Sequence, residues 1–445
     1  MPCQQQLSRL LPSVYSAVVA PFRVHIPWDA PAMAKANSRH PLPMSLVADD
    51  QEVVFHPALS PATPVTQERV AQDAARLKGD LAQLPAGLSA EAIEIFVASR
   101  DSASQAMMQG DEDLLFLHTS PMTLGKRPWI LHVETLITLF EPFFGQFRTW
   151  DIDLDREPAY HMVRHLLLAA NCRGIFTHIA RSRDDLPALF RDDTLARKVF
   201  FAPLGIDVPA AVAAAVPAAV ARRDAKQPAD EVVFLYTNSW HQHPASFYAR
   251  GGHELLLAFA ELCQRHPDRP CRLVLRTALP DNLGAGPIAA IKSHPRITLI
   301  DQPVSDAQLF DLLMQADVFV LPSANLHSIS ILRAMATGAV VLTADVFAAD
   351  EFIADGKTGV IVPGRRGMTY REDRARGLLR ERGEPLFSAE GGFRPALADA
   401  MERLLLDAGL RRDLRSAALA RVRQHHALEP WRAGFRAMLR TILRP

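Results

Sequence analysis

Residues 312–364 read LLMQADVFVLPSANLHSISILRAMATGAVVLTADVFAADEFIADGKTGVIVPG, and this stretch decides the fold. Its apolar run Val318–Leu321 predicts a short buried strand. A helix is expected from Ser328, with hydroxyl side chains at its start and Gly338 just past its end, and Ala339–Thr343 predicts a second strand. Strand, helix and strand at this spacing form a βαβ unit, which places the start of the helix at the carboxyl edge of a parallel sheet.

The start of that helix is the first candidate site. Its exposed N–H groups and the positive end of the helix dipole favour an anion, typically a phosphate. The residues concerned are Ser328, Ile329 and Ser330.

Composition narrows the class of protein. The chain has 445 residues, enough for two or three domains, with 49% apolar and 22% charged residues, as in folded globular proteins. The formal net charge is zero, so no global field attracts nucleic acid or anionic lipid. Cys3, Cys172, Cys263 and Cys271 are too dispersed for a zinc ribbon or a disulfide framework. With no long apolar run and no convincing secretion signal, we expect a cytoplasmic protein.

Four motifs in the same order carry a resemblance to a known family. They are Ala316–Ser323, Ala334–Gly338, Val340–Thr343 and Glu351–Gly359. This region resembles the carboxyl-terminal half of the GT-B glycosyltransferases, specifically the family 4 group (glycosyl transferases group 1). The resemblance implies an α/β chain with two facing Rossmann-like, doubly wound domains and a carboxyl-terminal helix that crosses back to the first domain.

Domain boundaries follow from the resemblance and from composition. Lys198–Asp207 resembles the phrase that closes the first domain of the family, so residues 1–207 are expected to form the acceptor-side domain. Residues 208–230, rich in Ala and Pro, are interpreted as a linker with one helical turn. The nucleotide-sugar-binding domain is expected over 231–427, and the returning helix over 428–445.

Elements outside the central stretch are less clearly marked. We expect Asp151–Asp155 to be a solvated loop and Arg365–Gly392 an extended surface loop. In the first domain the sequence predicts a helix over Thr66–Leu84 and strands over Val53–Phe55, Ile93–Ala98, Asp113–His118, Pro128–Val133 and Arg173–His178.

The resemblance implies where the donor nucleotide binds. Arg250-Gly251 takes the place of a Lys-Gly pair whose cation pairs with the donor diphosphate, and an arginine fork can do this bidentately. Alternatively, Arg250 is a solvated residue at a helix start. Asn238, Gln302 and Ser323 lie in the other segments that contact the nucleotide in the family.

Two predicted strands of the first domain end in histidine. In the family, a histidine at such a position often lies over the donor sugar. His132 is favoured over His118, because Glu134 follows it into a new helix, so His132 and Glu134 are candidate catalytic residues. The alternative is that each histidine is a hydrogen-bonded strand terminus.

One departure from the family concerns its two glutamates, which fall on Asn325 and Arg333. Asn325 can still hydrogen-bond sugar hydroxyls. Arg333 cannot accept from ribose hydroxyls, because guanidinium has only donors. We hypothesise that Arg333 is a second cation for the diphosphate, or that ribose recognition has moved to Glu351. The alternative is that Arg333 points outward and the site is degenerate.

The expected function is that of a retaining, metal-independent glycosyltransferase. It would take a UDP- or GDP-sugar to a glycan or lipid-linked acceptor in surface polysaccharide or glycolipid assembly, with peripheral contact at the inner face of the membrane. A non-catalytic GT-B module that binds a nucleotide or glycan for a partner enzyme is the alternative. A dinucleotide-dependent oxidoreductase is disfavoured, because no strand is followed by G-x-G-x-x-G.

Overall fold

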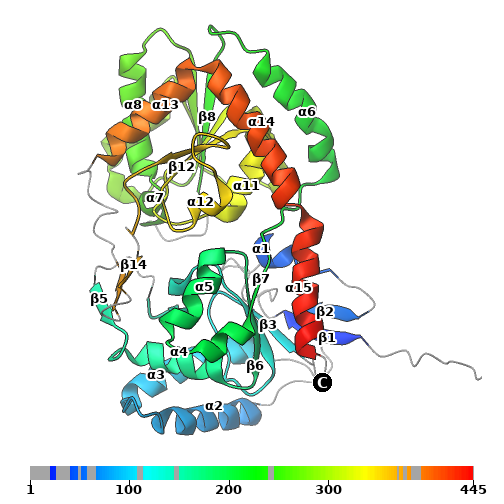
Figure 1. Ribbon diagram of the computed structural model, residues 1–445. Helices are drawn as coiled ribbons and strands as arrows, with labels where there is room; N and C mark the ends of the chain where they lie inside the picture. Colours follow the sequence, from blue (N-terminus) through cyan, green and yellow to red (C-terminus); the bar gives the residue numbers. More distant parts are fainter. Residues whose placement is uncertain are drawn as a thin grey trace, which may run out of the picture.

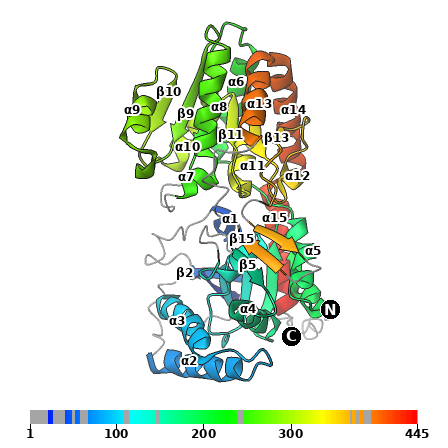
Figure 2. The same cartoon turned by 90° about the vertical axis from the view of Figure 1, so that its left-hand side faces the viewer.

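The computed structural model describes residues 21–26, 41–48, 52–57, 67–107, 114–144, 150–238, 245–367, 370–373, 378–381 and 392–443. These residues form two stacked domains, each built on one parallel sheet (Figures 1 and 2). A third, antiparallel sheet joins strands from both domains.

The first sheet has the order β2-β1-β3-β4-β6-β7, and every neighbouring pair is parallel. The strands are β1 (Phe22–Ile26), β2 (Val53–Pro57), β3 (Leu114–His118), β4 (Trp129–His132), β6 (Cys172–Thr177) and β7 (Val199–Phe201). The accompanying helices are α1 (Pro41–Met44), α2 (Gln67–Ala82), α3 (Ala90–Met107), α4 (Pro158–Leu168) and α5 (Ala180–Leu189).

The second sheet has the order β10-β9-β8-β11-β12-β13 and is also parallel. Its strands are β8 (Val232–Thr237), β9 (Cys271–Arg276), β10 (Ile297–Ile300), β11 (Val318–Leu321), β12 (Val340–Ala344) and β13 (Val360–Val362). The strand order reverses between β8 and β11, and such a switch point opens a crevice at the carboxyl edge. The helices are α7 (Ala245–Ala249), α8 (Gly252–Arg265), α9 (Ala285–Ser293), α10 (Asp306–Gln315), α11 (Ser328–Ala336), α12 (Ala349–Phe352), α13 (Phe393–Leu406) and α14 (Ala408–His425).

The central βαβ unit is confirmed as β11, α11 and β12, with Gly338 at a φ of 76° just past the helix. The predicted strand over Ile93–Ala98 is wrong, because this segment lies inside helix α3. Ile93, Phe96 and Val97 are buried, and their spacing of three and four residues is the period of one helix face. Strand β1 was not predicted from the sequence.

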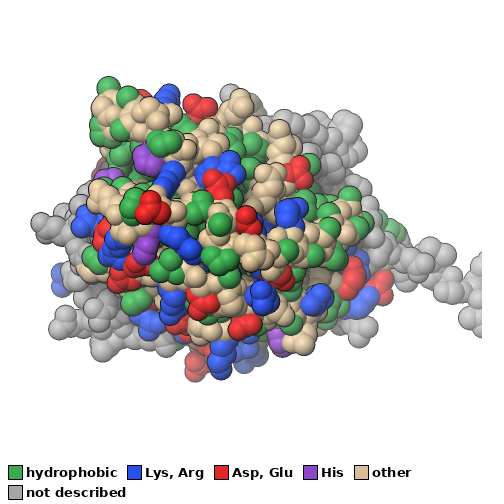
Figure 3. Space-filling view, turned by 90° about the horizontal axis from the view of Figure 1, so that it is seen from above, with side chains coloured by type: hydrophobic (Ala, Val, Ile, Leu, Met, Phe, Trp, Pro, Cys, Tyr) green, Lys and Arg blue, Asp and Glu red, His purple; other side chains and the backbone are tan. Residues whose placement is uncertain are grey.

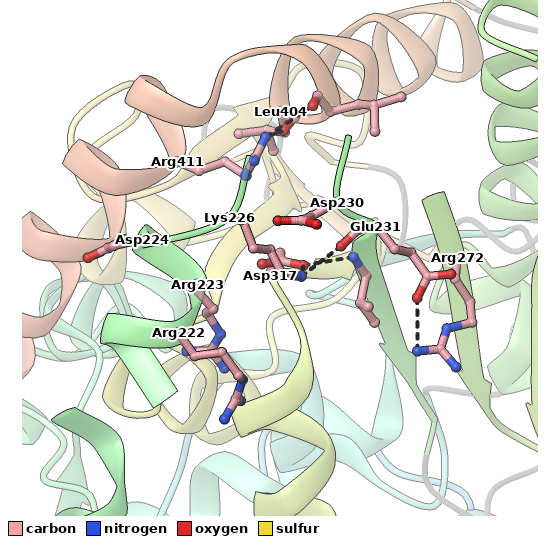
Figure 4. A network of polar contacts seen from close by, with 12 residues as sticks. Arg222, Arg223, Asp224, Lys226, Asp230, Glu231, Arg272, Asp317, Leu404 and Arg411 are labelled. Atoms are coloured by element: carbon pink, nitrogen blue, oxygen red, sulfur yellow. Dashed lines mark hydrogen bonds and ion pairs between the residues drawn. The ribbon is translucent and has the colours of Figure 1, made fainter. Parts of the chain in front are cut away.

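The segment 208–230 is more than a linker with one helical turn. It contains α6 (Ala210–Asp224), a helix of 15 residues that packs on the second domain. The buried Arg223 donates to the carbonyls of Thr337 (2.8 Å) and Leu313 (2.7 Å). Beyond the helix, Lys226 Nζ pairs with the buried Asp317 at 2.5 Å, and the same carboxylate accepts from the N–H of Val233 (Figure 4).

Both expected loops contain strands. β5 (Trp150–Asp153), β14 (Tyr370–Asp373) and β15 (Leu378–Glu381) form the antiparallel sheet, in the order β14-β15-β5. β5 belongs to the first domain, whereas the antiparallel pair β14 and β15 follows β13 of the second domain in the sequence. Backbone pairing of β15 with β5 therefore connects the two domains (Figure 2).

The carboxyl-terminal helix α15 (Leu428–Leu443) returns to the first domain, as predicted (Figure 1). Trp431, Phe435, Met438 and Leu439 are buried on its inner face. Trp431 stacks on Phe176 of β6 with ring centroids 4.8 Å apart, and its indole N–H donates to Ser45 Oγ at 2.9 Å.

Replacing Trp431 with alanine should lower the free energy of unfolding by about 3–5 kcal/mol, because a fully buried indole and its hydrogen bond are lost. Urea denaturation measures this. Arg440→Ala on the same helix is the control: its exposed pair with Glu52 should be worth at most about 1 kcal/mol. A Trp431→Ala loss no larger than that of the control would contradict the packing role of α15.

His426 lies at the junction between α14 and α15. Its Nδ1–H donates to the carbonyl of Leu204 at 2.8 Å, and the carbonyl of His426 accepts from the N–H of Ile206 at 3.0 Å. Burial lowers the pKa of His426 to about 4, against a weaker opposing effect of the Leu204 hydrogen bond. The imidazole is therefore neutral in the folded protein near neutral pH.

The unfolded chain binds a proton at His426 below about pH 6.5, while the folded protein does not until about pH 4. The free energy of unfolding should therefore fall as the pH is lowered from about 6.5 to about 4, by up to about 3 kcal/mol from this residue. His426→Asn keeps a donor for Leu204 without the titration. Thermal unfolding from pH 7 to 4.5 should show a weaker pH dependence in this variant, and parallel curves would refute the assignment.

Candidate functional site

Two loops meet at the switch point between β8 and β11. The N–H of Ala324 donates to the carbonyl of Ala249 at 2.7 Å, and Ser323 Oγ donates to the same carbonyl at 3.3 Å. Gly251 has a φ of 73°, and a Cβ at this position would lie 2.2 Å from the carbonyl oxygen of Pro322. Only glycine permits this approach, so Gly251 shapes the crevice through its backbone.

A group of polar side chains lies at the carboxyl ends of β8 and β9. Asn238 Nδ2 is 3.3 Å from Ser246 Oγ and from Thr277 Oγ1, while its buried Oδ1 has no hydrogen-bond partner. Arg276 Nη1 donates to the carbonyl of Asn238. Burial, with a smaller contribution from the positive charge of Arg276, lowers the pKa of Arg250 to about 10. The buried Arg250 and the partly exposed Arg276 repel each other and therefore favour an anion between or beside them.

Helix α11 begins at the same edge, after the loop that follows β11. Ser328 is buried, whereas Ile329 and Ser330 are partly exposed. Asn325 is also partly exposed, and its N–H donates to Ser323 Oγ at 3.0 Å. The structure thus brings Asn238, Arg250, Ser323, Asn325 and the first turn of α11 to one sheet edge, as the sequence suggested.

Arg333 lies further along α11 and contacts the start of α10. Its Nη1 and Nη2 atoms are 3.4 and 3.3 Å from the carboxylate oxygens of Asp306, and its guanidinium lies 5.1 Å from the ring of Phe310. A carboxylate therefore already balances its charge. Gln302, which precedes α10, is exposed.

Glu351 contacts the opposite domain. Its carboxylate accepts from the N–H of Ala180 at 2.7 Å and from the N–H of Arg181 at 3.0 Å, which are the first residues of α5. Since α5 has no capping side chain of its own, Glu351 serves as its cap. Both carboxylate oxygens are occupied in this way, and the neighbouring Asp350 pairs with Arg181 at 2.6 Å.

Three histidines form a row at the carboxyl edge of the first sheet. His118 Nδ1 is 3.1 Å from His132 Nδ1, and His132 Nε2 is 3.2 Å from His178 Nδ1. The His132 and His178 rings are parallel within 3°, and the indole of Trp431 packs edge-on against both. His132 is fully buried between the other two, so it can reach a ligand only through them.

Glu134 joins this row to the second domain. One carboxylate oxygen, Oε1, lies 3.4 Å from His178 Nε2 and accepts from Ser328 Oγ at 3.1 Å. The contact between Glu134 Oε1 and His178 Nε2 is within ion-pair range but outside strict hydrogen-bond geometry. His178 Nε2 has no hydrogen-bond partner. A glutamate of the first domain thus lies at the start of α11, where the sequence predicts a phosphate site.

Sequence reasoning missed His178 and Arg276 as site residues. His178 ends the predicted strand Arg173–His178, and Arg276 ends β9. A polar side chain at that end of a parallel strand is the signal that could have found them.

No group of three His, Cys, Asp or Glu side chains is placed to hold a metal within the described ranges. A cavity of about 690 Å³ lies elsewhere in the second domain, over the β8–β10 side of the sheet. Its lining includes Val233, Leu235 and Val274, and among its charged residues Arg272 pairs with Glu231 at 3.0 Å (Figure 4). This cavity is separate from the switch point.

Comparison with known proteins addresses the second domain first. Residues 244–373 match the model of the family described as Glycosyl transferases group 1. Over these residues the second domain resembles a group 1 glycosyltransferase domain. A stretch of 130 residues is 32% identical to the D-inositol 3-phosphate glycosyltransferase of Corynebacterium urealyticum. The match spans 28% of this chain and about 30% of the length of that relative.

Solved structures resemble the whole chain in fold. A glycosyltransferase from Rickettsia africae has a TM-score of 0.54 at 11% identity, covering 96% of this chain and 100% of its own. Anabaena HepE, in complex with UDP and glucose, has a TM-score of 0.52 at 12% identity, covering 95% and 100%. The chain therefore has the GT-B fold that the resemblance implied.

Two observations bear on contact with a membrane. None of the helices in the described part of the chain is long and apolar enough to span a bilayer. On the face over the second domain, basic and acidic side chains are interspersed (Figure 3). Near the carboxyl terminus, Arg415 contacts the carbonyl of Gly338, and Arg421 contacts those of Glu351 and Phe352, so these arginines serve internal contacts.

Glu351→Ala should loosen the domain interface, because α5 loses its cap; we expect a loss of about 1–2 kcal/mol. Small-angle X-ray scattering should show a larger radius of gyration than for the parent protein. Asp350→Ala, which removes only an exposed pair with Arg181, is the matched control and should change stability by less than about 1 kcal/mol. Identical scattering for Glu351→Ala and the parent would show that the cap does not hold the domains together.

Proposed function

We propose that this protein transfers a sugar from a nucleotide-sugar donor, a UDP- or GDP-sugar, to a glycan or lipid-linked acceptor, with retention of configuration and without a metal. The observation that supports this most strongly is the convergence of Arg250, Arg276 and the start of α11 on the switch point of a group 1 glycosyltransferase domain. HepE, which shares the fold, has been solved with UDP and glucose.

The leaving diphosphate must be stabilised as its charge develops. The backbone N–H groups at Ser328–Ser330 and the guanidinium groups of Arg250 and Arg276 would provide fixed donors for it. Preorganised donors of this kind in a poorly hydrated site lower the barrier without reorganisation, which is the usual largest contribution to catalysis. Burial of Arg250 strengthens its attraction to an anion.

Sugar and ribose recognition follow from the remaining contacts. We assign Asn325 to the sugar hydroxyls and the unpartnered Asn238 Oδ1 to a donor group of the nucleotide. The ribose role considered for Glu351 is disfavoured, because its carboxylate caps α5. The role of Arg333 as a second diphosphate cation is disfavoured as well, because Asp306 balances its charge.

The acceptor would enter from the first domain, whose strand ends carry the histidine row and Glu134. We propose that the acceptor is a glycan or lipid-linked intermediate of surface polysaccharide or glycolipid assembly.

The alternative, a non-catalytic module that binds a nucleotide or glycan for a partner enzyme, has one observation in its favour. Arg333 replaces a family glutamate and is held in an ion pair with Asp306. A site that binds a nucleotide without transferring sugar would fit that loss.

Arg250→Ala should abolish binding of the cognate nucleotide, because the diphosphate loses a buried cation. Calorimetric titration and thermal shift with UDP, GDP and dTDP measure this, with and without magnesium. One nucleotide should stabilise the parent protein, by about 2.7 kcal/mol at a concentration of 100 Kd.

Arg265→Ala is the matched control, since Arg265 lies at the far end of α8 and pairs with surface carboxylates. It should bind the nucleotide as the parent does. If no nucleotide binds the parent protein, or if Arg250→Ala binds equally well, the proposed donor site is wrong.

A further inference from the structure

The row of histidines ends beside a carboxylate, and this favours one position for the proton on each ring. Glu134 Oε1 lies 3.4 Å from His178 Nε2, beyond a strict hydrogen bond, but a carboxylate only accepts, so it favours the proton of a neutral His178 on Nε2. Its Nδ1 then accepts, and His132 Nε2 must donate to it. His132 Nδ1 in turn accepts from His118 Nδ1. Every ring therefore donates toward Glu134.

Adding one proton reverses the whole row without breaking a contact. If Glu134 is protonated, its O–H donates to His178 Nε2, His178 Nδ1–H to His132 Nε2, and His132 Nδ1–H to His118 Nδ1. The proton balance is simple: one proton enters the row at the partly exposed His118, one passes between each pair of rings, and one leaves His178 for Glu134 Oε1. Each ring thus holds one proton before and after the transfer.

The same carboxylate lies at the site proposed for the diphosphate. Glu134 Oε1 accepts from Ser328 Oγ at 3.1 Å, so its charge lies at the first residue of α11. A diphosphate bound to the N–H groups of this turn would bring a second anion beside it. Two neighbouring anions disfavour each other's charged form, so Glu134 would be neutral in the complex or would have to leave.

We propose that the Glu134 carboxylate takes up one proton through the row His118–His132–His178 when a donor diphosphate binds at the start of α11. This inference rests on the proposed function and assigns His118, His132 and His178 as positioning residues. Binding and protonation would be linked, so affinity for the nucleotide rises as the pH falls. The window lies between the pH at which Glu134 titrates without the diphosphate and the higher pH at which it titrates with it.

The surroundings of the row leave Glu134 as the group that changes charge. Phe352 of α12 and Trp431 of α15 enclose His178, and Ser182 of α5 donates only to the backbone carbonyl of Glu134. Among the residues that the structure describes, charged or titratable groups near the row include His426 between α14 and α15, which is neutral near pH 7, and Arg421 of α14, bound to backbone carbonyls. Glu351 and Arg181 are engaged between α12 and α5.

The test is calorimetric titration of UDP into the full-length protein in two buffers of different ionisation enthalpy, over a range of pH. The parent protein should take up about one proton per UDP. Within the window, Kd should rise about tenfold for each unit by which the pH is raised. Glu134→Gln keeps an acceptor for Ser328 but cannot titrate; it should bind UDP without proton uptake and independently of pH. Asp350→Asn, another interdomain carboxylate, should behave as the parent does.

Outcomes separate the two proposals. UDP binding with no proton uptake by the parent, or with equal uptake by Glu134→Gln, overturns the relay and leaves the donor site in place. No binding of UDP or inorganic pyrophosphate to either protein overturns the donor site and, with it, the relay. A ligand-independent readout is ¹⁵N NMR of labelled histidines: without nucleotide, His178 should be the neutral Nε2–H tautomer, and an Nδ1–H tautomer contradicts the direction of the row.

Discussion

Each domain supplies a glutamate to a helix N-terminus of the other. Glu351 of the second domain caps α5 of the first, and Glu134 of the first accepts from Ser328 at the start of α11 in the second. Right-handed βαβ units force all helix N-termini of a parallel sheet to its carboxyl edge. When two such edges face each other, their positive helix ends would repel, and a carboxylate crossing in each direction offsets this.

This arrangement places the candidate chemistry at the interface. The groups proposed to bind the nucleotide-sugar donor lie at the switch point of the second domain. The histidine row of the first domain ends at the same place. The β15–β5 pairing and helix α15 hold the domains at two further points. A ligand at α11 must therefore compete with, or neutralise, an interdomain contact, which couples binding to the relation between the domains.

The sequence predicted local elements well and distant contacts poorly. β11, α11 and β12 follow from hydrophobic period, a hydroxyl-rich helix start and a glycine, all within about 30 residues. The short run Ile93–Ala98 is apolar enough for a strand, and only its packing shows that it is helical. β5 pairs with β15, which is more than 200 positions away in the sequence. Because each strand is formed by this distant pairing, neither segment could be recognised as a strand from its own residues. The partners of Arg333 and Glu351 depend on packing between elements, and so could not be foreseen.

The central claim is that the switch point of the second domain holds a nucleotide sugar for transfer. The most direct measurement is the release of nucleoside diphosphate from a panel of UDP- and GDP-sugars, with and without added glycan acceptors. We expect slow release from one donor alone and faster release with a suitable acceptor. Tight binding of a nucleotide sugar with no release under any condition would contradict transferase activity and favour a binding module.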